Sequence, residues 1–174
     1  MEHTAHLVDI LDKEGVVVGQ KPRRDVDKLH NIYHTIHVLL ITPRGELVLG
    51  VIPPREDLLN LYARQIGSPM ATIRRTQETA LEAAKRGLAR ELFIDHAAPT
   101  LLGEKMYKLP DGRYNYMSVF YLVGEAPSVY SILDIDTLVV TTSREFRNMA
   151  THQTDEIAPS MHAIWSDYHA KLPV

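Results

Sequence analysis

Apolar and polar positions alternate along the chain with two different periods, which predict strands in some segments and helices in others. Pairs of apolar runs flank short turn segments that contain glycine, and each pair predicts a hairpin. These pairs are 6–11 with 16–20, 36–41 with 46–52, and 100–109 with 114–125. A further strand is predicted at 136–142. One or two short strands are predicted within 63–73, where Gly67-Ser68-Pro69 interrupts the pattern.

Helical spacing marks four other segments, namely 22–32, 76–94, the residues that follow Thr142, and 158–172. Thr79 with Glu82, and Thr142 with Glu145, have the spacing of a capping box, so helices are expected to begin just after each threonine. The last segment opens with a proline suited to a helix N-terminus. Its apolar residues form one stripe: Met161, Ile164, Trp165, Tyr168 and Leu172.

The order of these elements predicts an α+β protein, built as an α/β/α sandwich around a mixed central sheet. No repeat or long linker divides the chain, so residues 1–174 are expected to form a single domain. Residues 1–33 would form an N-terminal hairpin and a short helix, and residues 143–174 would form the C-terminal helices.

Composition narrows the classes of function. The chain of 174 residues is 45% hydrophobic and 24% charged, with a net charge of −3, so nothing indicates nucleic acid or an anionic membrane as a partner. The absence of cysteine excludes disulfides, thiolate metal sites and cysteine nucleophiles. No signal peptide or membrane helix is apparent, and the expected location is the cytoplasm.

The segment 76–94 is unusual for a helix. Its expected core stripe is Leu81, Ala84, Leu88 and Leu92. The adjacent face carries Gly87, Arg90 and Glu91, and a glycine in a helix interior costs about 1 kcal/mol relative to alanine. An ordinary amphipathic helix with one unfavourable residue is the simplest interpretation.

The same region resembles the Nudix box. That signature consists, in order, of a glycine, any five residues, a glutamate, any seven residues, and then Arg-Glu-apolar-x-Glu-Glu-x-Gly-apolar. Five positions match the box: Glu78, Arg86, Leu88, Glu91 and Ile94. Four positions depart from it. Thr72 replaces the first glycine, Gly87 and Arg90 replace two of the clustered glutamates, and Phe93 replaces the late glycine.

The similarity extends over roughly residues 6–172. "YHTIHVLLITPRGELVLG" and "VDILDKEGVVVGQKPRRDVDKLH" resemble the first core strands and the N-terminal hairpin of Nudix proteins near the isopentenyl-diphosphate isomerase branch. "VVTTSREF" and "APSMHAIWSDYHAKL" are similar to the closing strand and C-terminal helices of that branch. The resemblance implies a Nudix fold and an ancestry among enzymes that hydrolyse nucleoside diphosphate derivatives.

In that family the box glutamates hold Mg²⁺ or Mn²⁺, which prefer oxygen ligands and activate a water. Here the resemblance carries over catalytic roles only for Glu78, Arg86 and Glu91. Glu78 and Glu91 would hold one weak ion or none, because Arg90 would repel a cation by roughly 4 kcal/mol or more. The alternative for Glu91 is an ion pair with Arg86 or Arg90.

Without the usual metal, the arginines suggest an anion site. Arg74, Arg75, Arg86 and Arg90 would form a basic group that contacts phosphate directly, and the alternative is a set of surface ion pairs. Arg55 is a candidate replacement for the phosphate-binding residues that the branch carries after its central hairpin.

Three histidines, His30, His34 and His37, lie within eight residues and raise the question of a zinc site. On a strand, however, His34 and His37 point to opposite faces, which disfavours shared coordination. His37 is therefore a candidate substrate contact instead.

Three functions stay open. The favoured one is a Nudix-fold protein that binds a nucleotide or another diphosphate ligand with little or no hydrolysis. The second is an active, divergent Mg²⁺- or Mn²⁺-dependent hydrolase. The third, an isomerase of the related branch, is disfavoured because cysteine and the full set of metal ligands are missing. The N-terminal hairpin and the C-terminal apolar stripe are candidates for a homodimer interface.

Overall fold

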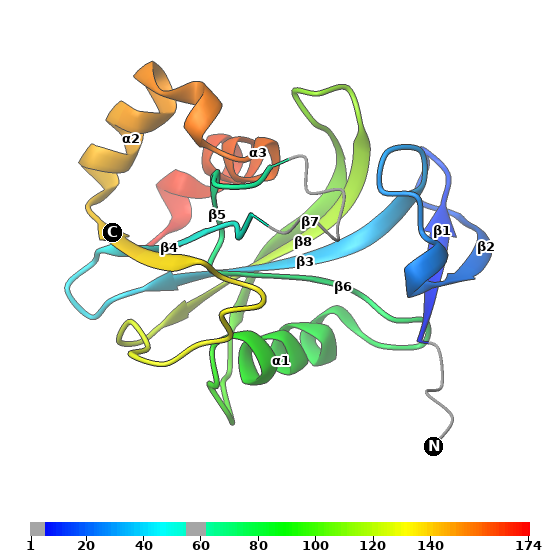
Figure 1. Cartoon of the computed structure of the whole chain (residues 1–174), viewed down its shortest axis with the longest axis horizontal. Coiled ribbons are helices and arrows are strands. Elements are labelled where there is room, and N and C mark those ends of the chain that lie inside the picture. Colours follow the sequence, from blue (N-terminus) through cyan, green and yellow to red (C-terminus); the bar gives the residue numbers. More distant parts are fainter. Residues whose placement is uncertain (1–5, 55–61) are drawn as a thin grey trace.

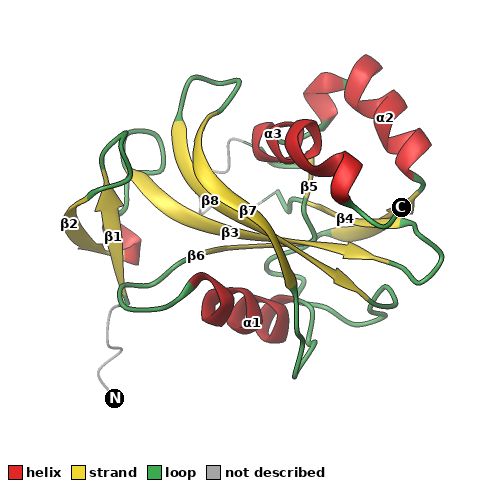
Figure 2. Cartoon of the chain, turned by 180° about the vertical axis from the view of Figure 1, so that it is seen from behind, coloured by secondary structure: helices red, strands yellow, loops and turns green. Residues whose placement is uncertain are grey.

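A computed structural model of the chain describes residues 6–54 and 62–174. It shows one mixed sheet with helices on both faces (Figure 1, Figure 2). None of the helices in these two ranges is long and apolar enough to cross a membrane.

Within the described residues, nine strands make up the sheet. In chain order they are β1 Leu7–Leu11, β2 Val17–Pro22, β3 Ile32–Ile41, β4 Leu47–Val51, β5 Ile66–Gly67, β6 Met70–Ile73, β7 Thr100–Lys108, β8 Tyr114–Val123 and β9 Thr137–Thr141. The helices are α1 Ala80–Glu91, α2 Ser143–His152 and α3 Pro159–Tyr168. Short 3-10 turns are η1 Arg23–Asp25, η2 Thr154–Glu156 and η3 His169–Lys171.

The long strand β3 is the hub of the sheet. It pairs in parallel with β8 from His34 opposite Tyr116 to Ile41 opposite Val123. Four residues of β3 pair antiparallel with β6, and its two ends pair with β1 and β4. Among the described strands, β6 pairs with β3 alone, so its second edge faces away from the sheet.

The two faces of the sheet bury separate cores, which makes the fold an α/β/α sandwich as predicted. Helix α1 covers one face, where Ile36, Val38 and Met70 pack against Ala84 and Leu88. Helices α2 and α3 cover the other face (Figure 1). The predicted C-terminal stripe is buried in that second core. It is therefore used inside the domain and is not available as a dimer surface.

Local signals predicted the helix starts correctly. Capping boxes form at Thr79 with Glu82 and at Thr142 with Glu145. Pro159 opens α3. The three hairpins, the short strands of 63–73 and the strand of 136–142 are also confirmed.

Two predictions of local structure are wrong. The segment 22–32 forms no α-helix. It contains the 3-10 turn η1 and a second turn at 28–30, where the Asp27 carboxylate accepts the backbone N–H groups of Leu29 and His30. Leu81 does not belong to the core stripe of α1, since it is 42% exposed. The face that packs inward instead contains Ala83, Ala84, Gly87, Leu88 and Glu91.

Candidate functional site

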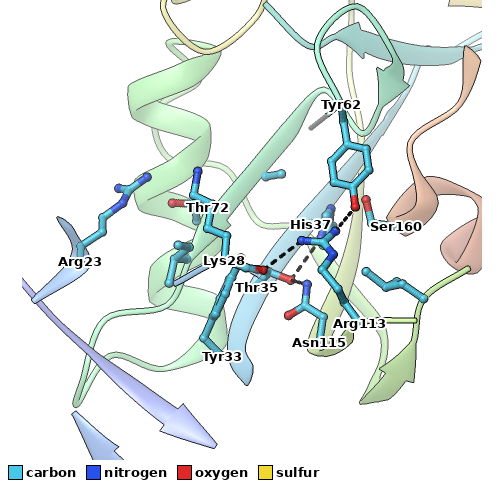
Figure 3. Close-up of a pocket in the computed structure, with 13 residues that line it drawn as sticks. Arg23, Lys28, Tyr33, Thr35, His37, Tyr62, Thr72, Arg113, Asn115 and Ser160 are labelled. Carbon is cyan, nitrogen blue, oxygen red and sulfur yellow. Dashed lines mark hydrogen bonds between the residues drawn. The ribbon is translucent and has the colours of Figure 1, made fainter. Parts of the chain in front are cut away.

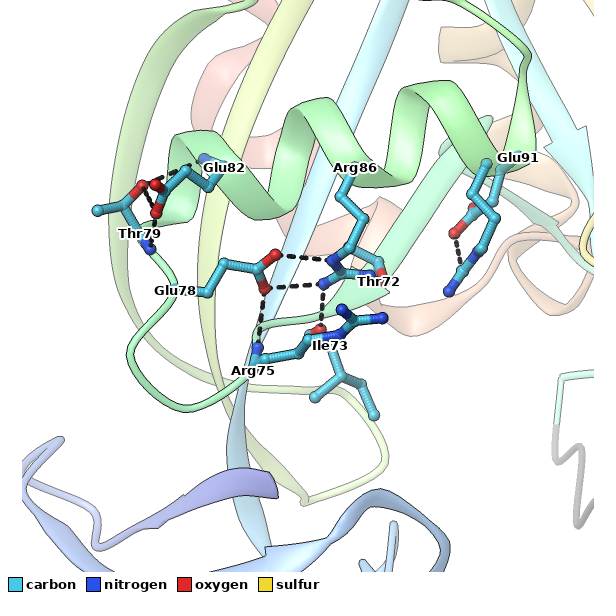
Figure 4. Close-up of polar contacts among 9 residues, drawn as sticks. Thr72, Ile73, Arg75, Glu78, Thr79, Glu82, Arg86 and Glu91 are labelled. Atoms are coloured by element: carbon cyan, nitrogen blue, oxygen red, sulfur yellow. Dashed lines mark hydrogen bonds and ion pairs between the residues drawn. The ribbon is translucent and has the colours of Figure 1, made fainter. Parts of the chain in front are cut away.

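Side chains of α1 cover the open edge of β6, where three of the predicted site residues lie (Figure 4). The N–H of Ala71 donates to a Glu91 carboxylate oxygen at 3.3 Å. Further along the same strand, Arg86 donates to the carbonyl of Ile73 at 3.0 Å and to the hydroxyl of Thr72 at 3.3 Å. The helix therefore satisfies hydrogen-bonding groups that an edge strand leaves open.

Arg86 and Glu78 form a bidentate ion pair. The Arg86 Nε and Nη2 atoms donate to the two carboxylate oxygens of Glu78 at 2.7 and 2.9 Å, and the backbone N–H of Arg75 adds a third hydrogen bond at 3.0 Å. Burial of Glu78 opposes its ionisation, but these hydrogen bonds outweigh it and lower the pKa of Glu78 below its ordinary value. Glu78 is thus a charged anchor for Arg86.

Glu91 lies at the other end of α1 and is only 2% exposed. Its carboxylate contacts the Arg90 guanidinium, as the ion-pair alternative predicted, and Arg90 also lies 3.8 Å from Asp134. Burial raises the pKa of Glu91 to about 7 although Arg90 acts to lower it, and the nearby Asp134 adds to the rise. Glu91 is therefore poised between its charged and neutral forms near neutral pH.

The carboxylates do not fit the divalent metal site that the resemblance implies. Twelve residues of α1 at a rise of ~1.5 Å each place Glu78 and Glu91 at opposite ends of the helix. Each carboxylate is already bonded to an arginine. Within residues 6–54 and 62–174, no group of three His, Asp or Glu side chains is arranged to hold a metal ion.

Gly87, at the position of a missing box glutamate, is closely packed. A Cβ atom on Gly87 would lie 2.4 Å from the sulfur of Met70, a fully buried side chain of β6. Met70 therefore fills the space where a side chain at position 87 would begin. The glycine is required by the packing and is not merely an unfavourable helix residue.

Four guanidinium groups converge near this edge. The pKa of Arg75 is lowered by burial and by the charges of Arg86 and Arg90. The pKa of Arg23, from the turn η1, is lowered by burial and by the same two arginines. Within the described part of the chain, the side chains of Arg23 and Arg75 form no hydrogen bond or ion pair. We call Arg23, Arg75, Arg86 and Arg90 the arginine cluster.

The cluster differs from the predicted basic group by one exchange. Arg74 pairs with Asp9 at 3.4 Å and belongs to the neighbourhood of His34, so it does not join. Arg23 takes its place, and sequence reasoning missed it because no local signal brings the N-terminal turn to the box helix. Arg55 lies outside the described residues.

An open cleft runs from Arg23 across β3 and β6. It consists of two connected cavities of about 230 and 310 Å³ that share five described lining residues: Arg23, Lys28, His37, Ala71 and Ser160. The larger cavity includes Glu91 and Asp134 and has apolar walls at Ile52, Pro53 and Leu133. The smaller one ends at Tyr62 and Arg113 (Figure 3). A cleft with apolar walls and a few charged groups is typical of small-molecule sites.

His37 lines both cavities, but both its ring nitrogens are engaged. Nδ1 lies 2.8 Å from the Ser68 hydroxyl and Nε2 lies 3.3 Å from the Thr35 hydroxyl. Burial lowers the pKa of His37 to about 4, so the ring is neutral at pH 7. His34 instead bonds Ser118 at 2.7 Å, and its pKa is lowered to about 3, chiefly by burial. His37 therefore offers the cleft a neutral ring surface.

Comparison with known proteins shows the fold but gives no match in sequence. No protein-family model matches the chain, and no curated protein matches it significantly. Among solved structures, the protein DR0079 from Deinococcus radiodurans is similar with a TM-score of 0.74 and 19% identity. The match covers 93% of this chain and 99% of that protein.

Two further structures carry names that identify the fold. A Nudix hydrolase from Nitrosomonas europaea matches with a TM-score of 0.59 and 18% identity, over 80% of this chain and 89% of its own. A bifunctional NMN adenylyltransferase/ADP-ribose pyrophosphatase from Francisella tularensis, in complex with AMP and a manganese ion, matches with a TM-score of 0.57 and 16% identity. That match covers 80% of this chain and 42% of the other. The chain has the Nudix fold.

Proposed function

We propose that this protein is a divergent member of the Nudix superfamily, near the isopentenyl-diphosphate isomerase-like branch, that binds a nucleotide or another diphosphate ligand with hydrolysis weak or lost. The arginine cluster carries the proposal. Neither Arg23 nor Arg75 forms an ion pair among the described residues, and the charges of Arg86 and Arg90 lower the pKa of both. Two arginines without an ion pair, held beside two that are paired with Glu78 and Glu91, favour an anionic ligand.

The position of the cluster favours a diphosphate. Arg23 is the member of the arginine cluster that lines both cavities, so an anion bound at Arg23 would leave the rest of the ligand in the cleft. The bifunctional protein from Francisella tularensis, 42% of which is covered by the structural match, is in a complex with AMP and a manganese ion. In this chain, guanidinium groups would neutralise the phosphates directly and replace a metal ion in that role.

Weak or absent hydrolysis follows from the side chains at the box. Position 87 has no carboxylate and no room for one, and position 90 places a cation on Glu91. A divalent ion at Glu91 would have to displace Arg90 and would share the larger cavity with Asp134, but the described residues contain no group of three His, Asp or Glu side chains arranged to hold a metal ion. The chemistry of these donors therefore favours binding over turnover.

Calorimetric titration with ADP and pyrophosphate in EDTA tests the binding. We expect ADP to bind, and Arg75→Gln to weaken it by about tenfold, because a charge-assisted hydrogen bond contributes on the order of 1.5–3 kcal/mol. Arg74→Gln is the matched control, since it removes the same charge from a neighbouring residue that pairs with Asp9. An equal loss in both variants would contradict a specific site at the arginine cluster.

The second candidate, an active hydrolase, is favoured by one observation. Glu91 lines the larger cavity, and a pKa of about 7 suits a group that accepts a proton. Turnover of nucleoside diphosphate derivatives with Mg²⁺ or Mn²⁺ that disappears in Glu91→Gln would establish this alternative and refute the loss of hydrolysis. Size measurements in solution would test the homodimer, for which the N-terminal hairpin stays a candidate surface.

A further inference from the structure

The two arginines of the cluster that form no ion pair within the described residues come from segments far apart in the chain, and the N-terminal strand contacts both segments. Arg23 lies in η1, whereas Arg75 lies in the loop between β6 and α1. The backbone N–H of Arg23 donates to the carbonyl of His6 at 3.0 Å. The N–H of Thr76, next to Arg75, donates to the carbonyl of Leu7 at 2.9 Å. Backbone hydrogen bonds therefore tie both segments to the start of β1.

Asp9 of β1 binds the side chains on both sides of Arg75. Its Oδ1 atom accepts a hydrogen bond from the Thr76 hydroxyl at 2.7 Å, and its Oδ2 atom lies 3.4 Å from Nη2 of Arg74. The Gln20 amide of β2 also donates to Oδ1, at 3.1 Å. The Asp9 side chain is only 12% exposed, so its charge depends on these donors. Asp9 thus joins the N-terminal hairpin to the loop that carries Arg75.

The loop after β6 has a conformation that local preference alone does not favour. Gln77 has a φ of 66°, in the left-handed region that residues with a Cβ atom adopt at a cost in free energy. Contacts on both sides hold this conformation. Thr76 is bonded to β1 through its N–H and its hydroxyl, and Glu78 accepts the backbone N–H of Arg75 at 3.0 Å (Figure 4). These bonds fix the direction in which the Arg75 side chain leaves the backbone.

We infer that Asp9 is a positioning residue of the anion site, which holds Arg75 beside Arg86 through the hydrogen bond to the Thr76 hydroxyl. The inference rests on the proposed function and adds to it an element, the N-terminal hairpin, that acts through Arg75. The positive charges of Arg86 and Arg90 act on Arg75, so an unrestrained Arg75 side chain would be repelled from them. A guanidinium that is already held in place also loses less conformational entropy when it binds an anion.

Thr76→Val tests the positioning role, because it removes the hydroxyl but keeps a branched side chain of similar size. Calorimetric titration with ADP in EDTA should show the affinity falling by about threefold to tenfold, the range expected for one lost hydrogen bond. Thr76→Ser keeps a hydroxyl and should bind ADP within about twofold of the unchanged protein. Arg74→Gln leaves both Thr76 bonds in place, so its ADP affinity should also change little.

A double-mutant cycle separates positioning from a general loss of structure. In an Arg75→Gln background, Thr76→Val should not weaken ADP binding further, because the guanidinium that the hydroxyl positions is already gone. Thr42→Val is the matched control. The Thr42 hydroxyl donates to the Glu46 carboxylate at 3.0 Å in the β3–β4 turn, and Thr42 is not among the described residues that line either cavity. This variant should lower the temperature of thermal unfolding and leave ADP affinity unchanged.

The outcomes separate this inference from the proposed function. If ADP binds and Thr76→Val binds it equally well, the positioning role is refuted and the proposed function stands. If Thr76→Val weakens binding by the same factor with and without Arg75, or if Thr42→Val weakens it as much, the effect does not act through Arg75 and the inference is refuted. If ADP does not bind to the unchanged protein, the proposed function fails, and this inference fails with it.

Discussion

Gly87→Ala tests whether the glycine of the box helix is dictated by packing. At a solvent-exposed position in the middle of a helix, replacing glycine with alanine stabilises a protein by about 1 kcal/mol. Here the new Cβ would lie 2.4 Å from the Met70 sulfur and 3.1 and 3.2 Å from the two carbons beside it. The side chain of Met70 is fully buried, so Met70 must change its conformation or the helix must move.

The overpacking cost is expected to exceed the gain in helix propensity. Extra methyl groups in well-packed cores cost roughly 1–3 kcal/mol. The net effect should therefore be a loss of about 1 kcal/mol in the free energy of unfolding. For a domain of this size that corresponds to a fall in Tm of about 2–4 °C. Urea denaturation and a thermal melt would measure both quantities.

A double-mutant cycle isolates the contact. Met70→Ala alone should cost about 2–5 kcal/mol because it leaves a cavity. In that background Gly87→Ala should become stabilising by about 1 kcal/mol, since the obstructing sulfur is gone. Gly19→Ala is a useful control, because a Cβ at that position meets nothing within 4 Å. If Gly87→Ala stabilises the otherwise unchanged protein by the full propensity gain, the packing argument is refuted.

Three other predictions concern the same helix. Arg86→Met should lower the unfolding free energy by about 3 kcal/mol in urea denaturation, because it leaves the half-buried Glu78 carboxylate unpaired, and adding Glu78→Gln should recover part of the loss. The folded-state pKa of Glu91, about 7, lies above its unfolded value of 4.5. Between these two pH values the native state therefore binds more protons at Glu91 than the unfolded state does. The contribution of Glu91 to the free energy of unfolding falls as pH rises through that range. Glu91→Gln should show a flatter pH profile in the same assay, and an unchanged profile would argue against the raised pKa. Leu81→Ala should change the unfolding free energy by less than about 0.5 kcal/mol while Leu88→Ala costs about 2–5 kcal/mol, and equal losses would contradict the observed orientation of α1.

Features set by neighbouring residues were predictable from the sequence. Both capping boxes depend on side chains three positions apart, and the hairpins depend on turns between adjacent apolar runs. The sandwich follows from the order of these elements. A local pattern alone was enough in each case.

The site was predictable only in part, because its geometry depends on contacts between distant segments. Leu81 has the spacing of a core residue, but α1 is oriented by Met70 beneath Gly87 and by the bond from Ala71 to Glu91. Arg74 and Arg75 are adjacent and identical in type. They differ only in what lies near them. Arg74 forms an ion pair with Asp9, whereas Arg75 lies near the arginines of α1 and belongs to the arginine cluster.

The cover that α1 provides for β6 has a consequence for how this sequence can change. An uncovered strand edge is a template for association with another chain. Substitutions at Arg86 or Glu91 would expose such an edge and invite aggregation, whether or not the protein turns over any substrate. These two residues therefore have a structural role that does not depend on catalysis. Their presence in a relative of this fold is, by itself, no evidence that the relative is an active enzyme.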